Sequence, residues 1–311
     1  MKVLVTGVSG FVGQSLVEIL KQRNICVVGV GRKLSASSAD TFFSVADFTN
    51  QDAWQEPLAG CDTVIHLAAR VHIMSECSAN PLIEFHKINV DGTKCLAETA
   101  ARAGIKRFVY VSSVKVNGEQ TTLPYTELDK PNPQDSYGIS KWEAEQVLHK
   151  ISEKTGLEVV IVRSPLVYGA GVKGNFAQLI KVLTKSIPLP LATVQNMRSL
   201  IYVENLVDAL ILSATHSSAA GKTYLVSDAE DVSTPELLRK LGEAMGRPAR
   251  LFCCPSALLR FTGRLVGKSD QIDRLLSSLQ VDSSKIQREL GWLPPFSLNE
   301  GLKATINAIG L

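Results

Sequence analysis

The chain has 311 residues, of which 45% are hydrophobic and 20% charged, and its formal net charge is +3. This composition excludes an intrinsically disordered chain, and so small a positive excess gives no support to nucleic acid binding. The six cysteines form no CxxC pair, which argues against a zinc site or a disulfide framework. With neither a signal peptide pattern nor a run of ~18 apolar residues, we expect a cytoplasmic protein without a metal or a membrane partner.

The N-terminus combines a short apolar run with a turn rich in glycine. Residues 3–5 predict a strand buried on both faces of a parallel sheet, and three glycines follow with the spacing GxxGxxG. Gly7 would allow a tight turn, Gly10 would let the backbone approach a pyrophosphate, and Gly13 would let the following helix pack closely on the strand. The helix of residues 11–22 would then aim its N-terminal amides at the phosphates. In the alternative, the three glycines after the strand form only a turn and bind no cofactor. The contacts predicted for a dinucleotide are Gly7, Gly10, Phe11, Val12 and Gly13.

The end of the second predicted strand indicates which dinucleotide is bound. Residues 26–30 form that strand, and Gly31, Arg32 and Lys33 follow it. A cofactor without a 2′-phosphate is usually held here by a carboxylate, whereas two cations suit a 2′-phosphate. We therefore favour NADP(H) over NAD(H). In the alternative, Arg32 merely stacks on the adenine.

Two further strands are expected to add contacts to the cofactor. Residues 42–46 predict a third strand, after which Asp47 would accept a hydrogen bond from the adenine amine or cap a helix over residues 50–58. Residues 63–67 predict a fourth strand, in which we interpret His66 as a packed side chain. The contacts expected here are Asp47, Phe48, Leu67, Ala68 and Ala69.

The following helix and strand lead to the edge of the sheet. Residues 81–103 predict an amphipathic helix, and Asn89 within it is a polar residue that needs a partner. Residues 108–111 predict a fifth strand. It delivers Ser112 and Ser113 to the edge where open α/β sheets bind ligands.

Tyr137 and Lys141 are four residues apart and would share one face of a helix. A lysine ammonium beside a phenol favours the phenolate and lowers the pKa of the tyrosine. A serine hydroxyl from the preceding strand end would bond the same oxygen. YxxxK alone is typical of an exposed helix pair, but the order of glycine turn, serines and YxxxK predicts a catalytic set of Ser113, Tyr137 and Lys141.

With these residues the chain resembles the extended short-chain dehydrogenase/reductase family, in its NAD-dependent epimerase/dehydratase branch, along nearly its whole length. The matching stretches are the glycine turn, Asp47, HLAA at 66–69, NVDGT at 89–93, VSS at 111–113, YGISK at 137–141 and RSPLVYG at 163–169. The resemblance implies a Rossmann-type α/β fold, a doubly wound parallel sheet with a smaller C-terminal lobe for a nucleotide sugar. It assigns residues 1–165 and about 199–230 to the dinucleotide domain, and about 166–198 and 231–311 to the lobe.

The resemblance also assigns residues to the site. Ser113 is the better match to the catalytic serine, because it stands five residues before Gly118 of VNG, where the family has VYG. Asn175 and Arg198 match substrate-binding positions at the diphosphate, with a surface ion pair as the alternative for Arg198. The chain has an extra serine between Arg and Pro at 163–165, which leaves the register there open. The remaining cofactor contacts implied are Asn89, Ser112, Tyr137, Lys141 and Pro165.

The C-terminal lobe is expected to begin near Val232. Residues 233–236 predict a capping box for the helix of residues 236–245. Residues 281–292 resemble the family's C-terminal stretch, in which Asp282 caps a short helix and Trp292 packs beneath it.

Two pairs of residues, at 114–115 and 32–33, bear on which reaction of the family this chain carries out. Dehydratases of the family carry Asp-Glu there and this chain has Val114-Lys115, so dehydration is set aside. The cations at 32–33 favour an NADPH-dependent 4-ketoreductase of a UDP-4-keto-(6-deoxy) N-acetylhexosamine. The alternative is a UDP-hexose or UDP-N-acetylhexosamine 4-epimerase with tightly bound NAD, and a non-catalytic NADP-sensing regulator is a remote one. The resemblance further suggests a homodimer through the helices at 85–102 and 137–154.

Overall fold

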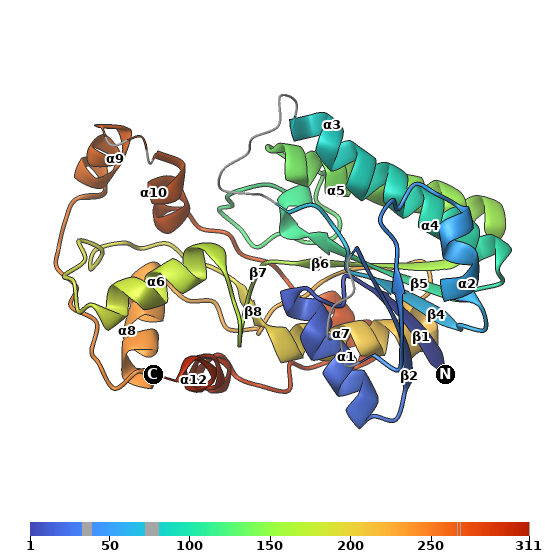
Figure 1. Ribbon diagram of the computed structural model, residues 1–311. Helices are drawn as coiled ribbons and strands as arrows, with labels where there is room; N and C mark the ends of the chain where they lie inside the picture. Colours follow the sequence, from blue (N-terminus) through green and yellow to red (C-terminus); the bar gives the residue numbers. More distant parts are fainter. Residues whose placement is uncertain (33–38, 72–80, 266, 268, 311) are drawn as a thin grey trace.

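The computed structural model describes residues 1–32, 39–71, 81–265, 267 and 269–310. Their centre is a parallel sheet with the strand order β3-β2-β1-β4-β5-β6-β9 (Figure 1). The strands are β1 (Lys2–Thr6), β2 (Cys26–Gly31), β3 (Thr41–Ser44), β4 (Thr63–His66), β5 (Arg107–Ser113), β6 (Glu158–Ser164) and β9 (Thr223–Leu225). The order reverses between β1 and β4, so the predicted doubly wound sheet is confirmed.

Helices cover both faces of the sheet. The side chains of Val3 and Val5 lie in one core with α1 (Phe11–Gln22) and α7 (Val203–Thr215), while Leu4 lies in the opposite core. That second core includes α4 (Gly92–Arg102) and α5 (Ser136–Thr155). Because successive side chains of a strand point to opposite faces, a continuous apolar run fills both cores.

Two predicted elements end differently in the structure. β3 stops at Ser44, two residues before its predicted end, and the expected helix over 50–58 consists of η1 (Asp52–Trp54) and α2 (Gln55–Leu58). Between them lies a turn in which both the amide and the hydroxyl of Thr49 bond the carboxylate of Asp47. Asp47 therefore caps its own turn, and the prediction that it caps the following helix is wrong.

The predicted helix over 81–103 is helical throughout but not uniform. It consists of α3 (Pro81–His86), a π-helical segment η2 (Lys87–Asp91) and α4. Asn89 lies in the π-helical segment. Such segments widen a helix locally and are frequent at functional sites.

A second group of elements packs beside the sheet, on the left of Figure 1. β7 (Leu166–Tyr168) and β8 (Leu200–Tyr202) pair with each other and share an apolar cluster with α6 (Gly174–Thr184), α8 (Thr234–Ala244) and α12 (Leu298–Ile309). The remaining elements are η3 (Val114–Val116), η4 (Ser217–Ala219), α9 (Ser256–Leu265), α10 (Ser269–Leu276) and α11 (Ser284–Leu290). The exact domain limits stay a prediction.

The start of α8 shows the first bond of the capping box predicted for residues 233–236, whereas a complete capping box lies at α12, where none was predicted. The Ser233 hydroxyl accepts a hydrogen bond from the amide of Glu236 at the start of α8, and a reciprocal capping box joins Ser297 and Glu300 at α12. Asp282 accepts from the amide of Ser284 at the start of α11. These bonds satisfy helix amides that would otherwise lack acceptors.

Candidate active site

The glycine turn joins β1 to α1 with little room for side chains. Gly7 has φ +74°, and a Cβ on Gly13 would lie 2.2 Å from the carbonyl oxygen of Gly7. In the described chain no side chain caps α1, and its first turn holds no acidic residue. The uncapped start of the helix and the absence of Cβ atoms fit the diphosphate of a dinucleotide.

The end of β2 presents a cation to solvent. Arg32 is exposed there, and its carbonyl accepts a hydrogen bond from Ser44 Oγ at 3.2 Å. Lys33 lies outside the described residues. The pKa of Asp47 is lowered, first by the bond from the Thr49 amide and then by the Thr49 hydroxyl. Contacts of Arg32 and Asp47 with a cofactor stay predictions.

His66 is a packed residue, as expected. Its Nδ1 bonds Thr6 Oγ1 at 2.7 Å, and its Nε2 bonds Thr93 Oγ1 at 3.0 Å. Burial lowers the pKa of His66 to about 3. Thr6 Oγ1 also accepts from the amides of Leu67 and Ala68 at 3.1 and 3.0 Å. The neutral imidazole therefore helps to fix the backbone after β4, beside the glycine turn.

Asn89 has the partners that a polar residue within a helix needs. Its Oδ1 accepts from the Arg70 amide at 2.7 Å, while its Nδ2 donates to the Arg70 carbonyl at 3.0 Å and to Ser140 Oγ at 2.9 Å. The side chain joins the segment after β4 to α5. It thereby positions the residue next to Lys141, and a direct contact with a cofactor stays a prediction.

Lys141 reaches from α5 to the end of β5. Its Nζ donates to the Val111 carbonyl at 2.8 Å, two residues before Ser113. The same Nζ lies 4.5 Å from the ring centroid of Tyr110 and 5.9 Å from that of Tyr137. Ser113 Oγ accepts from the Lys115 amide at 3.2 Å. The predicted catalytic residues thus come from the carboxyl end of β5 and the first turns of α5, which pack together.

The electrostatics of this pair differ from the sequence expectation. The pKa of Tyr137 is raised, first by burial and then by the carboxylate of Asp135, whereas we expected Lys141 to lower it. Burial also lowers the pKa of Lys141 to about 7, with Glu145 opposing the shift. The lysine is therefore only partly charged near neutral pH, and its amine is directed at a carbonyl instead of the phenol. The predicted direction for the tyrosine is wrong in this state.

A buried ion pair beneath Lys141 was not predicted from the sequence. Glu145 is fully buried and accepts two bonds from Arg163, from Nε at 3.0 Å and Nη2 at 2.6 Å. Ser112 Oγ donates to the same carboxylate at 2.5 Å, and Asn117 Oδ1 accepts from Arg163 at 3.1 Å. The hydroxyl of Ser112 is thus engaged within the protein. The sequence signal that could have placed Glu145 near the site is its position four residues after Lys141, on the same face of the helix.

A second ionic cluster adjoins the start of α5. Lys115 Nζ contacts the carboxylate of Asp135 and lies 2.7 Å from that of Glu119. Asp135 caps α5 by accepting a bond from the Gly138 amide at 2.7 Å. Asp135 precedes Tyr137 by two residues, so this cluster sets the charge beside the phenol.

The predicted substrate residues lie in the second group of elements. Asn175 is exposed in the first turn of α6. Arg198 Nη1 donates to the carbonyls of Arg274 at 2.7 Å and Ser277 at 3.1 Å, and burial lowers its pKa. Arg198 therefore holds the end of α10, which is not the surface ion pair considered as its alternative. Pro165 is buried between β6 and β7. Ligand contacts of these residues stay predictions.

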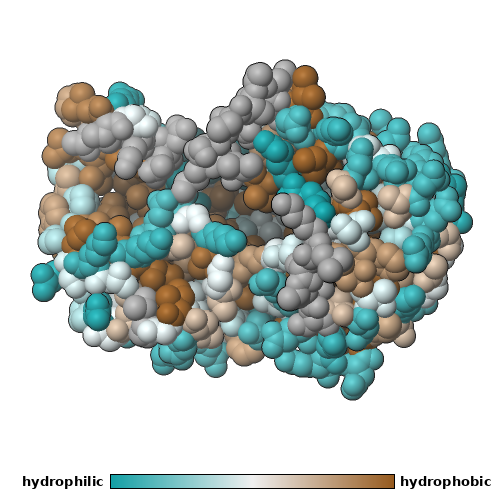
Figure 2. Space-filling view, in the orientation of Figure 1, coloured by the Kyte–Doolittle hydropathy of each residue, from teal (hydrophilic) through white to brown (hydrophobic). Residues whose placement is uncertain are grey.

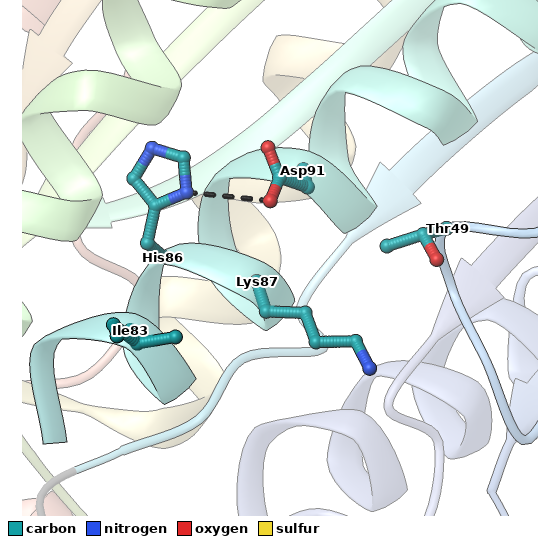
Figure 3. A pocket seen from close by; sticks show the side chains of 5 residues that line it. All are labelled: Thr49, Ile83, His86, Lys87 and Asp91. Carbon is teal, nitrogen blue, oxygen red and sulfur yellow. Dashed lines mark hydrogen bonds and ion pairs between the residues drawn. The ribbon is translucent and has the colours of Figure 1, made fainter. Parts of the chain in front are cut away.

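A cavity of about 520 Å³ is lined by residues of α3, η2 and the turn after Asp47 (Figure 3). It is lined by Thr49, Ile83, His86, Lys87 and Asp91, with His86 Nδ1 3.3 Å from Asp91. Since no predicted site residue lines it, we do not assign the active site there. Within the described residues, no cluster of three or more His, Cys, Asp or Glu could hold a metal ion, and no helix is long and apolar enough to cross a membrane.

Comparisons with known proteins agree with this geometry. The family model of the NAD dependent epimerase/dehydratase family matches residues 3–227. A UDP-glucose 4-epimerase of Vibrio cholerae is 41% identical over 98% of this chain and 94% of its own. A 3 beta-hydroxysteroid dehydrogenase/Delta 5-->4-isomerase of Mycobacterium tuberculosis is 31% identical over 97% and 88%. The structure of UDP-N-acetylglucosamine 4-epimerase from Bacillus cereus superposes with a TM-score of 0.82 at 21% identity, covering 100% and 96%.

Proposed function

Because this chain belongs to the NAD dependent epimerase/dehydratase family and is an enzyme of it, we propose that it interconverts a hydroxyl group and a ketone at C4 of a UDP-linked hexose or N-acetylhexosamine. The observation that carries the proposal is the anchoring of Lys141 on the Val111 carbonyl, which brings YxxxK to the strand end with Ser113. The 41% identity to a UDP-glucose 4-epimerase supports the substrate class.

Each residue of the set has a role in this chemistry. When bound, a nicotinamide cofactor supplies the hydride exchange that the reaction needs. Tyr137 moves the proton of the C4 oxygen, and Ser113 donates a hydrogen bond to the same oxygen. Lys141 carries the charge that stabilises the phenolate, and the turn at Gly7 holds the cofactor diphosphate. A ligand that brings negative charge to the site would favour the ammonium form of Lys141.

Two reactions share this framework. The relatives support 4-epimerisation, in which the ketone is formed and reduced on one enzyme with retained NAD. Arg32, exposed at the end of β2, supports the second candidate, a 4-ketoreductase that uses exchangeable NADPH. Val114 and Lys115 stand where a dehydratase would need two carboxylic acids.

A nucleoside diphosphate suits the lobe better than a neutral steroid does. Residues 166–198 and 231–311 hold 15 Lys and Arg against 8 Asp and Glu, whereas the rest of the chain holds 18 against 22. We propose that Asn175 and Arg198 contact the diphosphate, because an exposed amide and a planar cation suit phosphate oxygens. We also propose a dimer through η2, α4 and α5.

Product analysis distinguishes the candidates. The purified enzyme is incubated with UDP-glucose, UDP-GlcNAc, a UDP-4-keto-6-deoxy sugar or a 3β-hydroxysteroid, with and without NADPH, and products are identified by NMR. Epimerisation without added cofactor, together with NAD retained through purification, identifies the epimerase. NADPH consumption with the keto sugar alone identifies the reductase. Turnover of the steroid alone, or of none of the four, contradicts the proposal.

A further inference from the structure

Helix α9 presents large apolar side chains to solvent. Leu258, Phe261 and Leu265 are 51%, 58% and 71% exposed, whereas Leu259 is 7% exposed and packs into the lobe cluster. Spacings of three and four residues place the exposed three on one side of the helix, and we call them the apolar stripe. Figure 2 shows hydrophobic side chains gathered over α9, at the upper left. Single exposed leucines are ordinary, but three in register along one helix form a continuous surface.

Two arginines border the apolar stripe. Arg260 and Arg264 are one helical turn apart and both are exposed. Helical geometry, at about 100° per residue, places Arg264 about 60° from Phe261 at one border of the stripe, and Arg260 about 40° further round, on the polar side of the helix. Arg260 Nε is 3.4 Å from the Asp273 carboxylate on α10, and both side chains are more than half exposed, so the guanidinium stays accessible. Long cationic stems of this kind lie along an apolar surface while their charges stay in a polar layer.

The charge of the whole lobe points the same way. Its excess of seven cations, in contrast to the four excess anions in the rest of the chain, makes the lobe that carries α9 the part of the chain that an anionic surface attracts more strongly. Apolar side chains with flanking arginines on a helix too short to span a bilayer are the features of an interfacial helix.

We propose that α9 docks the lobe on an anionic lipid surface, with the apolar stripe in the headgroup region and Arg260 and Arg264 at the phosphates. This proposal departs from the expectation of no membrane partner, which rested on the lack of a segment long and apolar enough to span a bilayer. A second copy of this chain is a poorer occupant, because a two-fold contact through the stripe would bring the arginines of both copies together. Binding through three side chains and a few charges is weak and reversible.

Vesicle sedimentation of the full chain tests the proposal without any substrate. We expect co-sedimentation with phosphatidylcholine vesicles that contain phosphatidylglycerol, much less with phosphatidylcholine alone, and release at high salt. The L258S/F261S/L265S and R260Q/R264Q variants should each lose about tenfold or more in partitioning. The control variant L123S/L128S removes two leucines that are 76% and 95% exposed outside the lobe, and it should bind like the parent.

Three outcomes would overturn the inference. One is failure of the parent chain to bind anionic vesicles, and another is undiminished binding by the stripe variant. The third is that light scattering finds the parent chain to be a dimer and the L258S/F261S/L265S variant alone to be a monomer. This result would show that the apolar stripe contacts a second copy of the chain. Circular dichroism of each variant shows that it is folded. Because no turnover is measured, the result is independent of the proposed reaction.

Discussion

The amine of Lys141 hydrogen-bonds the backbone carbonyl of Val111 in a site where burial lowers the lysine pKa to about 7. The unfolded chain keeps this pKa near 10.5 and therefore binds more protons between about pH 7 and 10.5. Within that window the contribution of Lys141 to the free energy of unfolding rises with pH, by up to about 1.4 kcal/mol per unit. Below pH 7 the cost of burying the charge is fully present.

The K141M variant lacks this titration. We expect its free energy of unfolding, measured with urea at pH 7 and 9.5, to rise less with pH than that of the parent. The variant K21M, which removes an exposed lysine, should keep the parental slope. Equal slopes in the parent and K141M would show that the buried amine does not titrate in this range.

The hydroxyl of Tyr137 is assigned the proton transfer. In Y137F we expect turnover to fall by about 10²–10⁴-fold while cofactor and UDP-sugar binding stay close to parental, because only one oxygen is removed. Y125F, which removes a phenol bonded to the Gln120 carbonyl on the surface, is the matched control. Calorimetry and initial rates provide the two measurements, and parental turnover in Y137F would remove the tyrosine from the mechanism.

Arg32 provides a test of cofactor choice. Because its guanidinium is exposed at the end of β2, the R32A variant should bind NADPH at least about tenfold more weakly and NADH almost unchanged. Fluorescence titration with both dinucleotides measures the ratio. If both affinities fall equally, Arg32 stacks on the adenine and the argument for NADPH is lost.

The sequence predicted the parts of the site that depend on local pattern. The glycine turn, the serines at the end of β5 and the placement of Tyr137 and Lys141 on one helix follow from spacing along strands and helices. The ion pair of Glu145 with Arg163 could not be predicted in this way, since it arises only when α5 packs on β6. The direction of the Tyr137 pKa failed for a related reason, because burial depends on the completed fold.

The buried ion pair of Glu145 and Arg163 is expected to be essential for stability. E145Q leaves a buried guanidinium without its counterion, so the free energy of unfolding should fall by about 3–5 kcal/mol. E145L/R163M removes both charges and should cost much less. R23Q, which breaks the part-exposed pair with Asp208, should cost under about 1 kcal/mol. Urea unfolding compares the three, and a double variant as unstable as E145Q would argue against the charge explanation.

The ionic cluster of Lys115, Asp135 and Glu119 gives a prediction for the pH dependence of turnover. The carboxylate of Asp135 raises the pKa of Tyr137, and the ammonium of Lys115 lies between that carboxylate and Glu119. Lys141, on the same helix, has its Nζ 5.9 Å from the centroid of the phenol ring. Removing the Lys115 charge should therefore expose the phenol to more negative charge and disfavour the phenolate.

K115M should shift the rising limb of kcat/KM to higher pH, because more of the phenol stays protonated. D135N should shift it to lower pH, and asparagine still caps α5, so the helix start is preserved. K115M/D135N lacks both charges and should lie between the two single variants. If Lys115 had a purely structural role, K115M would instead lower kcat/KM at every pH without shifting its rising limb. The deciding measurement is therefore the complete pH profile of kcat/KM for the parent and the three variants.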